Sequence, residues 1–176
     1  MIVEGVDIDE FVKVANSNKI ACGMPVIMEA RSCSDKNFIR WDKILDAAKD
    51  KLDDEVMGKL LYILWQAWSW DMDGSIMYDL FKGANKQYLM TDEERKIFKN
   101  LPNRVTIYRG SQDISKGTNI SWTLDYERAE WFAAEVLVKT EVDKSIIAAY
   151  FNREKEVICP PELFSEVLKD RKSRIF

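Results

Sequence analysis

The pattern of hydrophobic and polar positions changes character near residue 100. Before that point, apolar residues recur at helical spacing within residues 42–51, and residues 55–70 are apolar nearly all round. The first pattern predicts an amphipathic helix and the second predicts a buried central helix. We interpret residues 71–74 as the exit turn of that helix; a calcium loop is disfavoured because the other ligands of an EF-hand are missing.

A third helix is predicted at the end of this region by its first turn. Thr91-Asp92-Glu93-Glu94 has the spacing of a capping box, in which Thr and Glu side chains bond each other's backbone N–H groups. The helix should end near Asn100, because Leu101-Pro102-Asn103 breaks the chain. Residues 1–100 are therefore expected to form a helical layer.

From Arg104 onward the pattern is typical of strands. β-branched and aromatic residues predict strands at 105–108, 120–123, 145–151 and 156–159, the last two joined by a tight turn at 152–153. Residues 110–119 are interpreted as a loop, and Asp125 as the cap of a helix running to about Leu137, with Val136 on its apolar side. These elements predict one α+β domain over 1–176, helical over 1–100 and β-rich over 101–176.

Composition narrows the class of protein. The 176 residues are 47% hydrophobic with a net charge of −4, which argues against disorder and against a polyanion-binding surface. A short basic tail (Lys169, Arg171, Lys172, Arg174) is interpreted as solvated. No apolar run approaches the ~20 residues of a membrane span, and the acidic N-terminus is unlike a signal peptide, so we expect a cytoplasmic protein.

The chemistry is restricted by the residues that the chain lacks. There is no histidine, which excludes Ser-His-Asp and Cys-His catalysis and histidine-based metal sites. Cys22, Cys33 and Cys159 form no C-x-x-C pair, so we expect reduced thiols and no bound metal.

Two carboxylates near the C-terminus carry the first chemical hypothesis. On a strand, Glu154 and Glu156 would project to one face about 6.5–7 Å apart, with Lys155 on the other face. At an effective dielectric near 20 they would repel by about 2 kcal/mol, a cost that a functional site would justify. The alternative is a solvated edge, and the functional reading depends on Arg109 and Ser121 facing the pair.

Three further positions have both functional and ordinary interpretations. Arg109 followed by Gly110 places a permanent cation beside a closely approachable backbone, although a strand-end arginine is often a surface residue. The hydroxyls of Ser121 and Thr123 share a face and could orient a carboxylate, or be plain strand residues. Trp122 and Trp131 are expected in the core.

Together these residues resemble the catalytic signature of the mono-ADP-ribosyltransferases of the Arg-Ser-Glu class. That family has an Arg on its first core strand, a Ser-x-Ser/Thr strand, and Glu-x-Glu preceded three residues earlier by an aromatic residue. The corresponding segments are Arg109, Ser121-Trp122-Thr123 and Phe151-x-x-Glu154-x-Glu156. Residues 157–164 also resemble the segment by which the chain leaves the last of these strands in the family. The resemblance covers residues 104–164 and implies an ADP-ribosyltransferase-like split β-sheet core. The 11 residues between Arg109 and Ser121 are fewer than usual.

The resemblance also implies roles for these positions. NAD⁺ would be the substrate and no metal would be needed. Arg109 would hold the phosphates or ribose, and Gly110 would meet the nicotinamide carboxamide. Ser121, with Thr123, would lie at the NAD⁺ site and fix Glu156, which would stabilise the oxocarbenium-like transition state. Glu154 would orient or deprotonate an acceptor arginine, and Phe151 would contact the target protein.

The chain would then be a small phage or bacterial effector that modifies a host or competitor protein. Two alternatives stay open at the level of sequence. One is a binding module on the same fold that blocks its partner without catalysis. The other is an NAD⁺ glycohydrolase or a transferase acting on nucleic acid, which the near-neutral C-terminal region disfavours.

Overall fold

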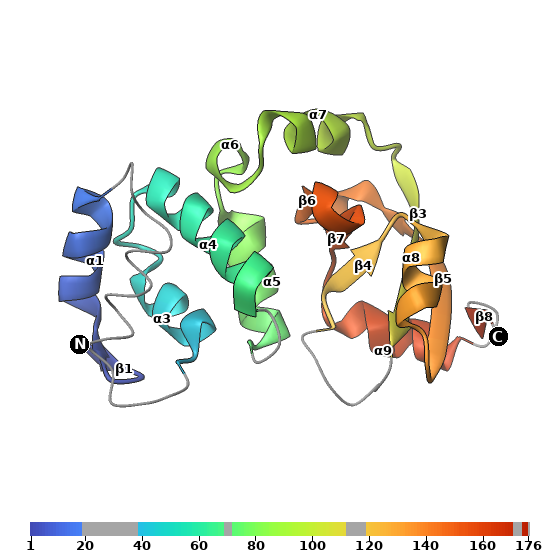
Figure 1. The fold of residues 1–176 in the computed structure, drawn as a ribbon, viewed down its shortest axis with the longest axis horizontal. Helices are drawn as coiled ribbons and strands as arrows, with labels where there is room; N and C mark the ends of the chain where they lie inside the picture. The colour runs from blue at the N-terminus through green and yellow to red at the C-terminus, as the bar shows by residue number, and fades with distance from the viewer. Residues whose placement is uncertain (19–38, 69–71, 112–118, 171–173, 176) are drawn as a thin grey trace. The chain divides into compact units, whose positions relative to one another are not determined.

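The chain divides into two compact units, Met1–Leu89 and Met90–Phe176 (Figure 1). The structure, a computed structural model, describes residues 1–18, 39–68, 72–111, 119–170 and 174–175. The change from helices to strands lies between Asn100 and Arg104, as expected, whereas the boundary between the compact units lies earlier, at Met90, because the helix capped by Thr91 belongs with the sheet. A single folding domain over 1–176 stays a prediction.

The described residues of the first unit form helices and one small hairpin. Its elements are β1 (Ile2–Val3), β2 (Val6–Asp7), α1 (Ile8–Ser17), α3 (Trp41–Ala48), α4 (Asp54–Trp68), α5 (Gly74–Gly83) and α6 (Lys86–Leu89). α3 and α4 confirm the two helices predicted from apolar spacing. α4 is buried along a stripe that includes Val56, Leu60 and Leu64, whereas Ile63 is half-buried.

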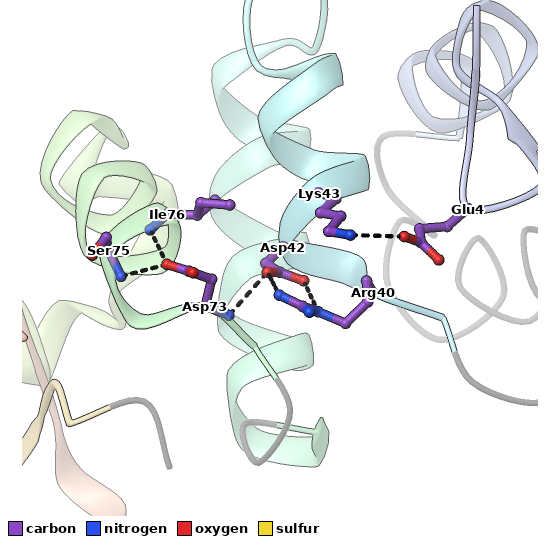
Figure 2. Close-up of polar contacts among 7 residues, drawn as sticks. All are labelled: Glu4, Arg40, Asp42, Lys43, Asp73, Ser75 and Ile76. Atoms are coloured by element: carbon purple, nitrogen blue, oxygen red, sulfur yellow. Dashed lines mark hydrogen bonds and ion pairs between the residues drawn. The ribbon is translucent and has the colours of Figure 1, made fainter. Parts of the chain in front are cut away.

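A buried carboxylate joins the start of α3 to the start of α5 (Figure 2). Asp42 is fully buried, forms an ion pair with Arg40, and accepts from Arg40 Nε and from the Asp73 backbone N–H, each at 2.9 Å. Asp73 in turn caps α5 by accepting from the N–H groups of Ser75 and Ile76. This pairing raises the pKa of Arg40, mainly through the hydrogen bond to Asp42. Within the predicted exit turn at 71–74, Asp73 is therefore the N-cap of the next helix, α5.

Replacing Asp42 by Asn should lower the free energy of unfolding by about 2–3 kcal/mol, because it leaves the Arg40 cation without its buried countercharge. Urea denaturation followed by circular dichroism measures the change. Asp46→Asn is the matched control on the same helix: Asp46 is partly exposed and forms an ion pair with Lys49 at the surface, so its loss should cost within about 0.5 kcal/mol. Equal effects of the two substitutions would contradict the structural role given to Asp42.

In its described residues, the second unit is an antiparallel sheet with three α-helices. The sheet has the strand order β6-β7-β4-β3-β5-β8. Its strands are β3 (Arg104–Ser111), β4 (Ser121–Thr123), β5 (Val136–Asp143), β6 (Ala149–Phe151), β7 (Glu156–Ile158) and β8 (Arg174–Ile175), and the helices are α7 (Asp92–Asn100), α8 (Tyr126–Phe132) and α9 (Glu162–Lys169). Together with the helical first unit, this sheet confirms the mixed α+β class.

The start of α7 has the predicted capping box. The Thr91 hydroxyl accepts from the Glu94 N–H, and the Glu94 carboxylate accepts from the Thr91 N–H at 2.9 Å. Glu94 is nevertheless almost completely buried, which a capping role alone does not require. Its second oxygen accepts from the backbone N–H of Asn152 at 2.9 Å, so the same carboxylate holds the turn between β6 and β7.

Several boundaries in the β-rich region were wrong. Gly110 and Ser111 belong to β3 and not to a loop, while residues 112–118 lie outside the described part of the chain. The helix capped by Asp125 ends at Phe132, and β5 begins at Val136, where a helix had been predicted. β5 pairs with β3 along its whole length, and this pairing outweighs the local helical spacing. The strand predicted at 145–151 is reduced to β6 by a 3₁₀ turn at Lys144–Ile146.

The core of the second unit encloses the one cysteine that the structure describes; Cys22 and Cys33 lie outside the described residues. Cys159 is fully buried, and burial raises the pKa of its thiol to about 12. None of the helices in the described ranges is long and apolar enough to cross a membrane.

Cys159 should therefore resist thiol reagents while the protein is folded, because its thiolate is suppressed and its sulfur is covered. In a Cys22→Ser, Cys33→Ser variant, reaction with Ellman's reagent at pH 8 should be at least about a hundredfold slower in buffer than in denaturant. Rapid reaction in buffer would contradict the burial of Cys159.

Candidate active site

The candidate site is organised around β4, a short strand between two neighbours. On one side Thr123 pairs with Glu156 and Ser121 with Ile158 of β7. On the other side the ladder with β3 consists of the pair Tyr108 and Thr123. Residues directly opposite each other in an antiparallel pair point to the same face, so Ser121, Thr123 and Glu156 share one face of the sheet.

Ser121 and Glu156 are in direct contact on this face. The Ser121 hydroxyl donates a hydrogen bond to the Glu156 carboxylate. Glu156 is 8% exposed, so its charge is largely removed from water. A buried carboxylate needs hydrogen-bond donors to remain ionised, and the hydroxyl supplies one and fixes the orientation of the side chain. The geometry agrees with the role that the resemblance implies for Ser121.

Arg109 reaches the same serine from the opposite side. By the alternation of β3, its side chain leaves the sheet on the face away from Ser121 and Glu156, so the expectation that Arg109 faces the glutamates was wrong. The guanidinium then donates to the backbone carbonyl of Ser121, to the Asn119 side chain at 3.3 Å, and lies 4.7 Å above the ring of Phe164 on α9. Ser121 therefore joins Arg109, through its carbonyl, to Glu156, through its hydroxyl.

The electrostatics of Arg109 reflect both burial and this link. Burial lowers the pKa of Arg109 to about 10, and the negative charge of Glu156 acts in the opposite direction. The guanidinium remains protonated at neutral pH. Its Nε is a buried donor without a hydrogen-bond partner among the described residues. A buried cation with an unused N–H group is suited to receive an anion such as phosphate.

The expected pairing of Glu154 and Glu156 on one strand was wrong. Glu154 ends a 3₁₀ turn (Asn152–Glu154), and Lys155 follows it in the left-handed region with φ of 45°. β7 begins only at Glu156, so the alternation argument does not apply to Glu154. The carboxylate of Glu154 instead forms an ion pair with Arg128 of α8, with Nη2 and Oε1 2.6 Å apart. The two carboxylates have different partners.

The turn that carries both glutamates is fixed from several sides. The Glu94 carboxylate accepts from the N–H of Asn152, as described above. The Thr123 hydroxyl donates to the Glu154 carbonyl at 2.7 Å. The side chain of Lys155 pairs with Asp125, the cap of α8, at 2.7 Å, and lowers the pKa of that carboxyl. Thr123 thus positions the main chain of the turn and not a carboxylate.

Gly110 has a structural function that the sequence did not reveal. α8 packs so closely on β3 that a Cβ on Gly110 would lie 1.8 Å from the Ala129 carbonyl oxygen and 2.7 Å from the Ala133 nitrogen. A glycine is required here for the approach of two backbones. Contact between Gly110 and a nicotinamide carboxamide stays a prediction.

The aromatic residues are distributed differently from the expectation. Phe151 is completely buried on β6 and offers no surface to a target protein, contrary to the role implied for it. Trp122 lies in the core against Phe164, as expected. Trp131 is 70% exposed, so its assignment to the core was wrong.

Two residues that matter here were missed. Arg128 contacts Glu154 across 26 positions of sequence, and no local pattern could signal that contact. Glu94 was identified as a helix cap, but its hydrogen bond from the Asn152 N–H was missed, because that contact depends on where β6 lies.

No set of three or more potential ligand residues in the described ranges is arranged to hold a metal ion.

The chain matches no protein-family model, no curated protein and no solved structure in the comparisons.

Gly110→Ala should destabilise the protein by about 2–3 kcal/mol, because a backbone carbonyl cannot move away from the new methyl group without shifting α8. Gly83→Ala is the matched control, since a Cβ there would meet no atom within 4 Å, and we expect a change within about 0.5 kcal/mol. Urea denaturation measures both. A Gly110→Ala variant as stable as the control would show that α8 does not lie against β3 in this way.

Proposed function

We propose that this chain is a mono-ADP-ribosyltransferase that cleaves NAD⁺ and transfers ADP-ribose to an arginine side chain of a host or competitor protein. One observation carries the proposal: Ser121 binds the Arg109 guanidinium with its carbonyl and the Glu156 carboxylate with its hydroxyl. The three residues of the Arg-Ser-Glu signature, which lie on three strands, are thereby connected in space.

The fold is proposed to be the split sheet of this family. β3 extends to Ser111 and β4 begins at Ser121, yet their ladder contains the pair Tyr108 and Thr123. The Arg109 guanidinium donates to the Ser121 carbonyl, which would accept from a backbone N–H of β3 if the ladder were longer. This incomplete pairing between two central strands supports a sheet divided at the site.

The chemistry assigned to these residues is displacement at the anomeric carbon of the nicotinamide-side ribose. The bond from C1′ to the nicotinamide nitrogen breaks, and its electron pair leaves with neutral nicotinamide. A nitrogen of the acceptor guanidinium forms the new bond to C1′ and loses a proton, for which Glu154 is the nearby base. Glu156 stabilises the positive charge that develops on the ribose, as carboxylates do in glycoside cleavage. Arg109 lies on the other face of the sheet, so its proposed role is to hold the Ser121 carbonyl, and through Ser121 the hydroxyl that orients Glu156.

Glu156→Gln should reduce ADP-ribose transfer by about 10²–10³-fold, because an amide cannot offset the charge of the oxocarbenium-like transition state. The assay uses labelled NAD⁺ with a cell lysate as acceptor. Glu141→Gln is the control: it is the same isosteric change on an exposed residue of β5 that pairs with Arg104, and it should retain full transfer.

The same assay separates the alternatives. Nicotinamide release without transfer, lost in Glu156→Gln, would identify a glycohydrolase instead. A protein that consumes no NAD⁺ and keeps its biological effect in Glu156→Gln would be a binding module, and the proposal would be withdrawn.

A further inference from the structure

The Glu154 carboxylate, which the proposed function assigns to the acceptor arginine, already pairs with the guanidinium of Arg128. Arg128 Nη2 lies 2.6 Å from Glu154 Oε1, and the Arg128 guanidinium carbon is 5.1 Å from the ring centres of both Trp131 and Phe132. The two rings pack edge to face at 4.7 Å, and Trp131 is 70% exposed. One carboxylate and two aromatic rings thus surround one arginine head group at the protein surface.

This set of groups has the chemistry that recognises an arginine side chain. A carboxylate pairs with the guanidinium fork, and aromatic faces attract its delocalised charge. An indole ring has an electron-rich face, and a planar cation is a favourable partner for that face. Any arginine that entered here would meet the groups that Arg128 meets now.

Arg128 is not required to hold the turn that carries Glu154. The main chain of this turn is bound by Glu94 at Asn152 and by Thr123 at the Glu154 carbonyl. Arg128 bonds only the carboxylate of Glu154 in the described contacts, and both side chains are partly exposed. A partly exposed ion pair is weak, so it can open to admit a competitor.

We propose that Glu154, Trp131 and Phe132 form a slot for a guanidinium, that Arg128 fills the slot in the free protein, and that an acceptor arginine binds by displacing Arg128. The inference rests on the proposed function, in which Glu154 serves the acceptor. Arg128 is then a competitor within the chain itself. It lowers the affinity for arginine acceptors, and Glu154 is free to take the acceptor's proton only after Arg128 has left.

The test is binding of agmatine, a small guanidino compound, measured by calorimetry without NAD⁺. Arg128→Ala should bind agmatine about tenfold more tightly than the wild type, because the competing guanidinium is gone. Arg128→Lys should fall between them, since an ammonium keeps the charge but cannot lie flat on both rings. Trp131→Ala in the Arg128→Ala background should lose most of the gain.

The control is Arg153→Ala, which removes an equal charge from the same turn and should leave agmatine affinity within about twofold of the wild type. Unchanged or weaker binding by Arg128→Ala would overturn the slot, and so would an equal gain in Arg153→Ala. If Arg128→Ala does not fold, agmatine should still shift the Arg128 side-chain Nε–H signal in the NMR spectrum of the wild type; an unmoved signal overturns the inference. Because NAD⁺ is absent, these outcomes do not depend on whether the protein turns NAD⁺ over.

Discussion

The arrangement of the second unit depends on one backbone carbonyl that the sheet leaves unpaired. β4 has three residues and lies between β3 and β7, and its ladder to β3 is limited to Tyr108 and Thr123. The carbonyl of Ser121 would be a costly orphan, because buried backbone groups need partners. Arg109 supplies the donor from its side chain. The hydroxyl of the same serine is then directed to Glu156 on β7, so the cation and the carboxylate are connected through one residue.

Carboxylates organise both units by accepting from backbone N–H groups. Asp42 binds the N–H of Asp73 at the start of α5, and Glu94 binds those of Thr91 and Asn152. Each is buried, and each joins segments distant in sequence. A charged acceptor forms stronger hydrogen bonds than a neutral one, which offsets part of the cost of burial. For Glu94 the result is a rigid connection between α7 and the turn that carries Glu154.

The sequence predicted elements where local rules decide the structure. The capping box at Thr91 and Glu94 is present, and so are the strands that contain Ile107 and Trp122. It failed where tertiary pairing decides. The first two residues of β5, Val136 and Leu137, were assigned to the end of a helix and the rest of the strand was not predicted; its pairing with β3 selects the strand. The contact of Ser121 with Glu156 was expected from the resemblance alone, whereas that of Arg128 with Glu154 requires the placement of α8.

The turn at Lys155 explains why the two glutamates can be only two residues apart. On one continuous strand they would lie about 7 Å apart and repel by about 2 kcal/mol at an effective dielectric near 20. A left-handed lysine is itself costly, by roughly 1 kcal/mol, but it ends the strand between them. Glu154 is thereby turned toward the Arg128 cation, while Glu156 remains on the sheet with a hydroxyl donor. The strained residue thus separates a carboxylate paired with a guanidinium from one that accepts from a hydroxyl on the sheet, a division of tasks that the proposed transfer between two substrates would require.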